Sequence, residues 1–324
     1  MKAVIVAEDH SLSWEEFEDP GVGPNDVLIK IHATAINRAD LMQRRGFYPP
    51  PPGASPIMGL ECAGEVVETG SDCSRYKKGD RVCALLAGGG YSEYAAVHEG
   101  SVLPVPAGLD YEQGAALPEV FATAWLNLFM EAGLQPGEKV IIHAGASGVG
   151  TTAIQLCKAF GSPCFVTLGS KEKLEACLAM GADAGAVRHD GPFLEAAQAF
   201  ADGSGIDVIL DPVGAGYFGD NLKLLGLGGR LVLIGLMSGT KTELDLAQLM
   251  MKRARVIGST LRARPVEEKA AIMAQLEERV WPKIESGEIK PVIEKVFPIT
   301  EVSAAHELVA SDKTTGKVVL AVES

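Results

Sequence analysis

The sequence has little positive charge, and this limits the partners that the protein can have. Its 324 residues include 29 Lys and Arg against 42 Asp and Glu, which gives a formal net charge of −13. Surfaces that bind nucleic acid or anionic membranes need clustered Lys and Arg to displace counterions or to meet lipid head groups. We therefore expect neither partner, and an anionic ligand would have to be held by local features of the chain.

Long apolar runs and paired cysteines are also missing. No stretch reaches transmembrane length, and residues 1–6 enter strand-like sequence without the apolar region of a signal peptide. The six cysteines are scattered and form no Cys-x-x-Cys, so neither a zinc knuckle nor a disulfide framework is indicated. We expect a cytoplasmic protein whose cysteines are reduced and mostly lie in the core.

The hydrophobic pattern changes near residue 118. Up to that point, short alternating runs between Gly, Pro and Asp turns predict an all-β, barrel-like lobe with one short helix. Beyond it, continuous apolar runs alternate with amphipathic stretches, which is typical of buried parallel strands covered by helices. The strands are expected at residues 140–143, 164–168, 184–187, 206–211, 230–235 and 255–258.

The last part of the sequence is expected to return to the first lobe. A charged helix is predicted over residues 266–284, followed by apolar segments at 292–297 and 317–322. The predicted domains are therefore 1–118 with 261–324, and 119–260. Ligands of open α/β sheets bind beside the carboxyl ends of the parallel strands, so we expect the binding cleft there.

A glycine-rich turn follows the first expected parallel strand and precedes a helix-like stretch. This arrangement presents the N–H groups of a helix start to a pyrophosphate and lets the backbone approach it closely. The spacing is Gly-x-x-Gly-x-Gly, so the flanking strand and helix carry the prediction of dinucleotide binding. The alternative is that the glycines only permit a tight connection. The residues of the turn are Gly145, Ala146, Ser147, Gly148, Val149 and Gly150.

The residues after the second strand favour NADPH. A site for NAD usually has Asp or Glu about 20 residues after the glycines, and that acid would repel a 2′-phosphate. Here Gly169 and Ser170 stand at this point, and Lys171 and Lys173 follow. We expect Lys173 or Lys171 to meet the phosphate, with Arg188 as a secondary candidate. The alternative is that these lysines are solvated, since they oppose the helix dipole.

A zinc site is not expected. Where medium-chain zinc alcohol dehydrogenases have a catalytic Cys, the stretch 35–40 offers Asn37, and their Gly-His-Glu is replaced by residues 59–61, Gly-Leu-Glu. The four cysteines of the structural zinc loop are also absent between residues 81 and 97. A Cys/His zinc site therefore lacks its ligands.

The chain resembles the zinc-free quinone oxidoreductases of the medium-chain dehydrogenase/reductase superfamily, and among them the p53-inducible quinone oxidoreductase group. The motifs that carry this resemblance are NRADLMQR at 37–44, PPPGAS at 50–55, HAGASGVG at 143–150 and GKVVL at 316–320. It implies an α/β fold with a GroES-like β-barrel catalytic domain plus a doubly wound Rossmann NADPH-binding domain. It also implies NADPH-dependent two-electron reduction of quinones without metal or flavin, usually by a homodimer.

The resemblance further implies roles for single residues. It puts Asn37 beside the nicotinamide ribose, Tyr48 over the substrate pocket, Thr123 near the nicotinamide and Ser147 at the pyrophosphate. Lys173 matches the lysine that meets the 2′-phosphate, whereas Arg188 replaces a tyrosine. Less firmly, it puts further residues at the border of the cofactor, namely Leu236, Met237, Leu261, Arg262 and Lys317.

Three of these positions have plainer interpretations. Asn37 can equally be the N-cap of a helix over 38–45, and Tyr48 can be a loop aromatic packed on the prolines at 49–52. Glu61 is better explained as a buried strand carboxylate satisfied by Arg or by backbone N–H groups than as a catalytic acid.

The predicted reaction is direct hydride transfer from NADPH to a small-molecule quinone. Tyr48 or water would supply a proton or hydrogen bond to the acceptor oxygen, and Asn37 would hold the ribose. One alternative is an NADPH-dependent alkenal or enoyl reductase, which the same fold could support. The other is an NADPH-binding structural or regulatory protein without catalytic activity.

Overall fold

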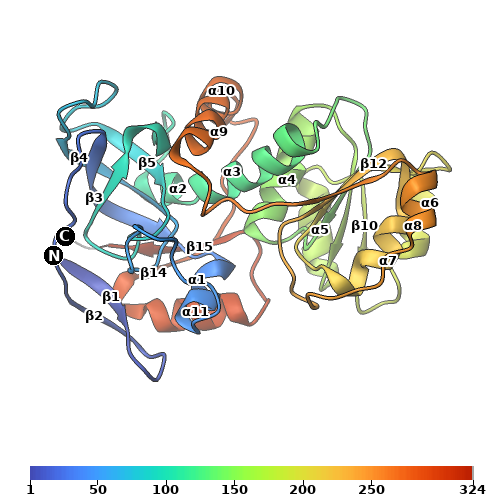
Figure 1. Cartoon of the computed structure of the whole chain (residues 1–324), viewed down its shortest axis with the longest axis horizontal. Helices are drawn as coiled ribbons and strands as arrows, with labels where there is room; N and C mark the ends of the chain where they lie inside the picture. The colour runs from blue at the N-terminus through green and yellow to red at the C-terminus, as the bar shows by residue number, and fades with distance from the viewer. Residues whose placement is uncertain (323–324) are drawn as a thin grey trace. The chain divides into compact units, whose positions relative to one another are not determined.

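The chain divides into two compact units. The computed structural model describes residues 1–322. Unit 1 contains Met1–Ala122 and the chain from Leu261 onward, and unit 2 contains Thr123–Thr260 (Figure 1). Helix α3 (Pro118–Trp125) contains the junction between the two. The first junction thus lies four residues beyond the boundary expected from the sequence, and the second lies at that boundary.

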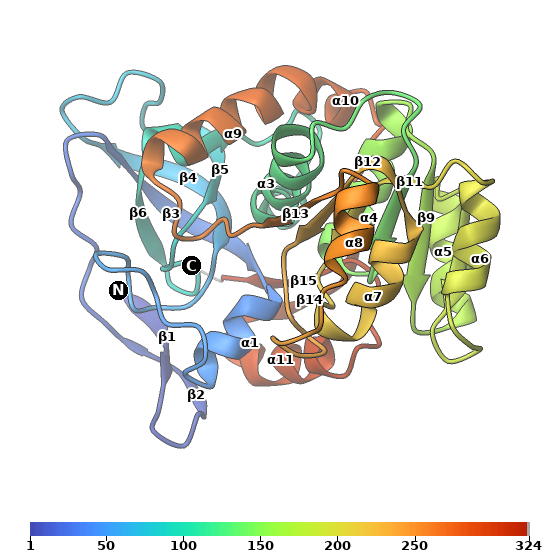
Figure 2. The same cartoon turned by 45° about the vertical axis from the view of Figure 1, so that its right-hand side comes forward.

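Unit 2 is built on a six-stranded parallel sheet of order β10-β9-β8-β11-β12-β13. In chain order this is 3-2-1-4-5-6, the doubly wound arrangement, in which the direction of winding reverses between β8 and β11. Helices connect the strands and pack around them (Figure 2). The strands are β8 (Val140–His143), β9 (Cys164–Leu168), β10 (Ala184–Val187), β11 (Ile206–Asp211), β12 (Leu225–Leu233) and β13 (Arg255–Gly258). The helices are α4 (Gly148–Ala159), α5 (Lys171–Met180), α6 (Leu194–Ala201), α7 (Ala215–Leu224), α8 (Leu246–Met251) and the π-helical turn Leu126–Glu131.

The strand predictions in unit 2 are confirmed except at β12. That strand begins at Leu225 rather than residue 230 and ends at Leu233 rather than residue 235. Its first half contains three glycines, which have low strand propensity. They interrupt the apolar run from which a strand is predicted. The pairing of β12 with β11 is also irregular there, because the register shifts between Ile206 and Val208.

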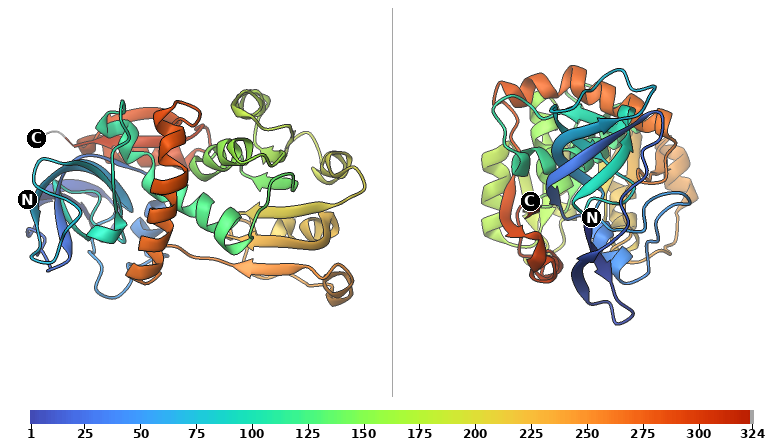
Figure 3. Two further views of the ribbon diagram at one scale, coloured as in Figure 1. Left: turned by 90° about the horizontal axis from the view of Figure 1, so that it is seen from above. Right: turned by 90° about the vertical axis from the view of Figure 1, so that its left-hand side faces the viewer.

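Unit 1 contains a seven-stranded sheet drawn from both ends of the chain (Figure 3). Its path is β14-β15-β3-β4-β5-β7, with β6 also paired to β3, and a separate hairpin joins β1 to β2. The return of the C-terminal segments is as expected, since β15 pairs antiparallel with β3. The strands are β1 (Lys2–Val6), β2 (Leu12–Glu16), β3 (Asp26–Ala35), β4 (Glu61–Thr69), β5 (Arg81–Leu85), β6 (Tyr94–His98), β7 (Val102–Pro104), β14 (Ile293–Pro298) and β15 (Lys317–Ala321).

Two helix predictions for unit 1 were wrong. The first lobe has α2 (Tyr111–Ala115) in addition to the expected short helix, α1 (Arg38–Arg44). Asp110 and Gln113 form a capping box at the start of α2, a signal that the sequence does contain. The helix expected over 266–284 is two helices, α9 (Val266–Arg279) and α10 (Trp281–Glu285). Pro282 explains the break, since proline cannot continue the helical hydrogen bonds.

Each unit has its own core. The core of unit 1 centres on residues of β3, β4 and β5, joined by residues of α11 (Val302–Ala310) and β15. The core of unit 2 centres on the strands and on α6 and α7. All six cysteines are free and all but Cys73 are buried, as expected. Within residues 1–322, no helix has the length and apolar character needed to cross a membrane.

Candidate functional site

The glycine turn lies where the winding of the unit 2 sheet reverses. It follows β8, which pairs with β9 on one side and β11 on the other. Ser147 is the N-cap of α4, and its Oγ accepts a hydrogen bond from the Gly150 N–H at 3.1 Å. The first N–H groups of a helix have no acceptor within it and lie at the positive end of its dipole. This arrangement fits a pyrophosphate.

Two of the glycines are also required by packing. A Cβ on Gly145 would lie 2.7 Å from Cβ of Val166 on β9, and one on Gly150 would lie 2.5 Å from the carbonyl oxygens of Ala144 and Gly145. The plainer interpretation of the glycines therefore holds at these two positions. It is compatible with dinucleotide binding, because close packing of the turn is part of the fingerprint of such sites.

The end of β9 brings together three of the predicted residues. Ser170 is the N-cap of α5, and its Oγ accepts from the backbone N–H of Lys173 at 3.3 Å. The Arg188 guanidinium lies beside Gly169, with Nη2 3.6 Å from where a Cβ on that glycine would be. A guanidinium, a hydroxyl and a helix start thus lie together without an acidic residue at 169 or 170, which fits a phosphate.

The other predicted residues of unit 2 are less informative. Leu236 and Met237 are half-exposed in the loop after β12, and the Met237 N–H donates to the Pro212 carbonyl of the loop after β11 at 3.2 Å. Thr123 is buried in α3, where its carbonyl accepts from the Asn127 side chain at 2.7 Å. None of these contacts identifies a ligand.

In unit 1, Asn37 and Lys317 meet in a buried charged cluster. The Lys317 ammonium lies 2.7 Å from Oε1 of Glu61 and donates to Oδ1 of Asn37 at 2.6 Å and to the Ile36 carbonyl at 3.0 Å. Glu61 is fully buried, and its other oxygen accepts from the Glu119 N–H at 2.9 Å. The interpretation of Glu61 as a satisfied strand carboxylate is confirmed, although its cation is a lysine rather than an arginine.

The bonds of Asn37 limit what it can offer to a ligand. Its amide nitrogen donates to Glu61 at 2.9 Å and to the Ala35 carbonyl at 3.4 Å, while Lys317 occupies one side of its oxygen. The capping box of α1 also directs the Asn37 side chain toward the backbone N–H of Asp40. The side chain of Asn37 is therefore engaged by protein groups, and its amide nitrogen has no donor to spare. Asn37 is also the N-cap of α1, so that interpretation is confirmed, whereas its contact with the ribose stays a prediction.

A second buried set underlies this cluster and was not singled out from the sequence. Asp40 accepts hydrogen bonds from the Asn37 N–H at 2.7 Å, the Gly59 N–H at 3.1 Å and the Tyr91 hydroxyl at 3.2 Å. The same hydroxyl lies 3.1 Å from Nε2 of His306. Burial raises the pKa of Asp40 to about 6 and lowers that of His306 to about 3. The separation of Asn37 and Asp40 is that of an N-cap and N3 pair, a signal that was available.

Arg262 stabilises the segment that contains Tyr48 through hydrogen bonds. It is buried, and its guanidinium donates to the Tyr48 carbonyl at 3.2 Å, the Ala87 carbonyl at 2.7 Å and the Gln43 side chain at 2.8 Å. The guanidinium carbon also lies 5.2 Å from the centre of the Tyr48 ring. Burial raises the pKa of the Tyr48 phenol, and Arg262 opposes this, so the phenol is a neutral donor at pH 7. Leu261, the neighbour of Arg262, is buried too.

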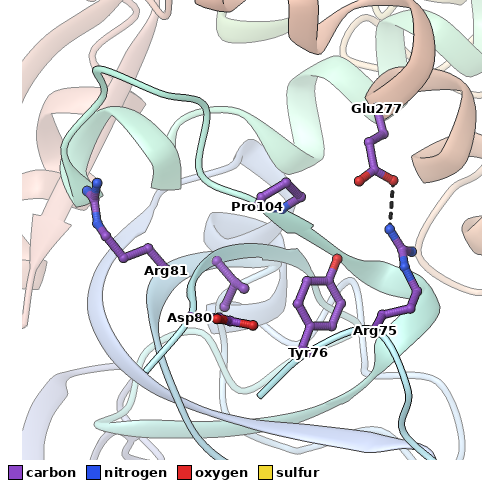
Figure 4. A pocket seen from close by; sticks show the side chains of 7 residues that line it. Arg75, Tyr76, Asp80, Arg81, Pro104 and Glu277 are labelled. Atoms are coloured by element: carbon purple, nitrogen blue, oxygen red, sulfur yellow. Dashed lines mark hydrogen bonds and ion pairs between the residues drawn. The ribbon is translucent and has the colours of Figure 1, made fainter. Parts of the chain in front are cut away.

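A surface hollow of about 450 Å³ in unit 1 is separate from all of these residues (Figure 4). Its charged and polar groups are already engaged: Arg75 pairs with Glu277 at 2.7 Å, and the Tyr76 hydroxyl donates to the Val102 carbonyl at 2.6 Å. The Arg81 guanidinium donates to the Leu109 carbonyl at 2.9 Å. No predicted site residue lines this hollow, and we do not assign chemistry to it.

We find no cluster of possible metal ligands in the part of the chain that the structure describes. Residues 1–322 contain no group of three or more His, Cys, Asp or Glu side chains arranged to hold a metal ion. The positive charge beside Asn37 and Glu61 comes instead from Lys317. A metal-free reaction remains a prediction.

Comparisons with known proteins agree with this architecture. Residues 23–107 match the alcohol dehydrogenase GroES-like domain family, and residues 148–278 match the zinc-binding dehydrogenase family. The expected fold, a GroES-like domain plus a Rossmann domain, is confirmed. The quinone oxidoreductase of Rattus norvegicus is 32% identical over 303 residues, which cover 93% of this chain and 90% of that protein.

Two solved structures share the fold over almost the whole chain. The Escherichia coli quinone oxidoreductase complexed with NADPH is 28% identical with a TM-score of 0.86, and 99% of each chain is covered. The CurK enoyl reductase is also 28% identical with a TM-score of 0.86, again over 99% of each chain. These similarities therefore include relatives of two different activities.

Proposed function

Because the chain belongs to the quinone oxidoreductase family of the medium-chain dehydrogenase/reductase superfamily, we propose that it reduces quinones with NADPH. The reaction is a two-electron reduction by direct hydride transfer, without metal or flavin. The structural observation that carries the proposal is the Ser147-capped start of α4 at the reversal point of the unit 2 sheet. That is where doubly wound sheets bind dinucleotides.

The residues of unit 2 support NADPH as the cofactor. The first N–H groups of α4, at Gly148 and Val149, would hold the pyrophosphate, and Ser170 and Arg188 would hold the 2′-phosphate. Lys171 and Lys173, both in the first turn of α5, are further candidates for that phosphate. The bound cofactor supplies a hydride from C4 of its nicotinamide ring.

Unit 1 would contribute orientation and a proton. Asn37 would contact a hydroxyl of the nicotinamide ribose, and Lys317 and Glu61 hold its amide in one orientation. Hydride addition to a quinone leaves a hydroquinone anion, which needs one proton on oxygen. The neutral Tyr48 phenol or water would donate it. That anion is much less basic than an alkoxide, so no strong acid or Lewis acid is required.

Two finer proposals accompany this function. The motifs at 37–44 and 50–55 support membership of the p53-inducible group.

The uncovered edge of unit 2 supports a homodimer, since β13 is an edge strand and Met250 and Met251 on the neighbouring helix α8 are 71% and 74% exposed. Exposed apolar edges favour pairing with a second copy. A monomeric mass in light scattering at assay concentration would contradict the dimer.

Activated alkenes are the alternative acceptors, and the likeness to the CurK enoyl reductase favours them. In that reaction the hydride adds to the β-carbon and the proton to the α-carbon. The deciding experiment compares the rates of NADPH oxidation with an ortho-quinone and with a 2-alkenal. A higher kcat/KM for the quinone supports the proposal, and the reverse supports an alkenal or enoyl reductase. Tight NADPH binding without oxidation by any acceptor would support a structural or regulatory protein.

A further inference from the structure

Four buried polar side chains form a continuous hydrogen-bonded chain in unit 2. Thr167 Oγ1 lies 2.9 Å from Nδ1 of His143, and Nε2 of His143 lies 2.7 Å from Oδ1 of Asn221. The Asn221 amide nitrogen then donates to Oδ2 of Asp211 at 2.9 Å. All four residues are at most 2% exposed. They come from β9, β8, α7 and β11, so the chain crosses the point where the sheet reverses.

The chain has one self-consistent direction. The carboxylate of Asp211 can only accept, so the Asn221 amide nitrogen faces it and the Asn221 oxygen faces His143. His143 must then carry its hydrogen on Nε2, and its Nδ1 accepts from the Thr167 hydroxyl. Burial lowers the pKa of His143 to about 4, which keeps the ring neutral as this pattern requires. Every link donates toward Asp211.

The Asp211 end of the chain fixes backbone. Oδ1 of Asp211 accepts from the N–H groups of Val213 at 2.6 Å and Gly214 at 3.0 Å, and so holds the turn after β11. Ser238 connects that turn to the loop after β12, because its Oγ donates to the Val213 carbonyl at 2.8 Å and accepts from the Gly216 N–H at 2.7 Å. The loop held in this way is the one that carries Leu236 and Met237.

The other end of the chain lies at the start of the two phosphate-binding segments. His143 and Thr167 are register partners at the ends of β8 and β9. The glycine turn begins two residues after His143, and Gly169 follows two residues after Thr167. The row therefore connects the ends of β8 and β9 to the turn after β11, and Ser238 connects that turn to the loop after β12.

We propose that the row Thr167–His143–Asn221–Asp211 positions the loops that hold the dinucleotide, so that cofactor affinity depends on it more than stability alone requires. The inference rests on the proposed function, since it assigns positioning residues to the same binding site. None of the four needs to touch the cofactor. The row lies under loops expected to hold both halves of the dinucleotide, so a break in it weakens NADPH and NADH by the same factor.

The test removes one hydroxyl of the row and compares the effect with that of removing another buried hydroxyl of unit 2. Thr167→Val deletes the hydroxyl at nearly constant shape. Ser162→Ala deletes a different buried hydroxyl of unit 2, whose Oγ donates to the Gln135 carbonyl at 3.1 Å just before β9, at the opposite end of that strand. One buried hydrogen bond contributes roughly 1 kcal/mol, or about fivefold in an equilibrium constant. Both variants should therefore lose similar amounts of Tm.

Cofactor binding distinguishes the two variants. The Kd for NADPH and for NADH, measured by nucleotide fluorescence, should rise about fivefold in Thr167→Val and stay within twofold in Ser162→Ala. Thr167→Ser, which restores the hydroxyl, should restore the Kd. In turnover, Thr167→Val should raise the KM for NADPH while kcat at saturation stays near that of the wild type. Asn221→Leu, which cuts the middle of the row, should raise both Kd values at least as much.

The outcomes separate this inference from the proposed function. A wild-type protein that binds neither nucleotide would defeat the proposed function. Normal binding by the wild type with unchanged Kd values in Thr167→Val and Asn221→Leu would overturn the positioning role alone. A loss confined to NADPH would also overturn it, because that result would assign the residues to the 2′-phosphate. If Asn221→Leu does not fold, the three conservative variants still decide the question.

Discussion

The cluster around Lys317 in unit 1 and the row of side chains in unit 2 satisfy their buried polar groups in opposite ways. The cluster pairs the Lys317 ammonium with the carboxylate of Glu61, whereas the row is neutral until it ends at the carboxylate of Asp211. No cation contacts that carboxylate in the hydrogen bonds and ion pairs described above; backbone N–H groups and an amide satisfy it. Burial of the Asp211 carboxyl accordingly raises its pKa to about 6. Removing one partner of the charged cluster should therefore lower the free energy of unfolding by a large amount. Removing one hydrogen bond of the neutral row should lower it by a smaller amount.

The sharpest way to break this comparison is to remove the cation of unit 1. Lys317→Met leaves the Glu61 carboxylate buried without its ion-pair partner, and we expect the free energy of unfolding to fall by about 3–5 kcal/mol. Urea titration followed by circular dichroism measures it. Lys317→Met combined with Glu61→Gln should recover a large part of the loss. An unchanged midpoint in the single variant would show that the cluster is not held by its charges.

The pH dependence of unit 2 gives the next largest effect. The pKa of His143 falls from 6.5 to about 4 on folding, so its contribution to stability is complete above pH 6.5 and is lost as the pH falls toward 4. The raised pKa of Asp211 acts in the opposite direction between about pH 6 and pH 4. His143→Gln removes the first effect only.

The variant should therefore lose about 3 kcal/mol less stability than the wild type between pH 7 and pH 4. Urea unfolding of both proteins across this range measures the difference. The groups that face His143 are the neutral Thr167 and Asn221 and the rings of Phe193 and Tyr217, so no nearby charge masks it. Parallel curves for the two proteins would show that the pKa of His143 does not fall on folding.

A smaller effect tests whether unit 2 selects the cofactor. Arg188→Ala removes the guanidinium beside Gly169, and we expect the Kd for NADPH to rise about tenfold while that for NADH changes less than twofold. Competition between the two nucleotides in a fluorescence titration measures the ratio. Equal losses for both would place the 2′-phosphate away from Arg188. This selectivity contrasts with the equal losses expected for Thr167→Val.

The smallest effect concerns the proton in unit 1. Tyr48→Phe keeps the ring against Arg262 but removes the hydroxyl, and we expect kcat with a quinone to fall by about tenfold or less, because water can also protonate a weakly basic anion. The Kd for NADPH should stay unchanged. Full turnover with normal binding would remove Tyr48 from the mechanism. A changed Kd would instead mean that the segment around residue 48 had moved.

The fold was largely predictable because its signals are local. Buried parallel strands are continuous apolar runs, which is why β8, β9 and β11 have their expected bounds. The edge strands β10 and β13 also have their expected bounds, although they are more exposed. The start of β12 was missed because its glycines weaken the pattern. The glycine turn was recognised because strand, turn and helix adjoin in the sequence.

The interior of the candidate site was less predictable because its contacts are distant in sequence. Lys317 and Asn37 are 280 residues apart, and His143 and Asn221 are 78 apart. Only the family resemblance indicated that Lys317 would lie near the cofactor; no pattern in the sequence did so. The sequence also gave no indication that Arg262 would contact Tyr48. The residues next to an arginine in the sequence do not show whether its side chain is buried or exposed.

The burial of the cysteines has a chemical consequence for a protein that handles quinones. Quinones are electrophiles that alkylate thiolates, and only the deprotonated thiol reacts at an appreciable rate. Burial raises the pKa of Cys62 and Cys83 far above the thiolate range, and a hydrogen bond with Cys164 together with burial does the same for Cys157. Burial also raises the pKa of the partly exposed Cys73. The fold thus keeps these thiols in the protonated, unreactive form, which would protect them from the acceptors proposed for this protein.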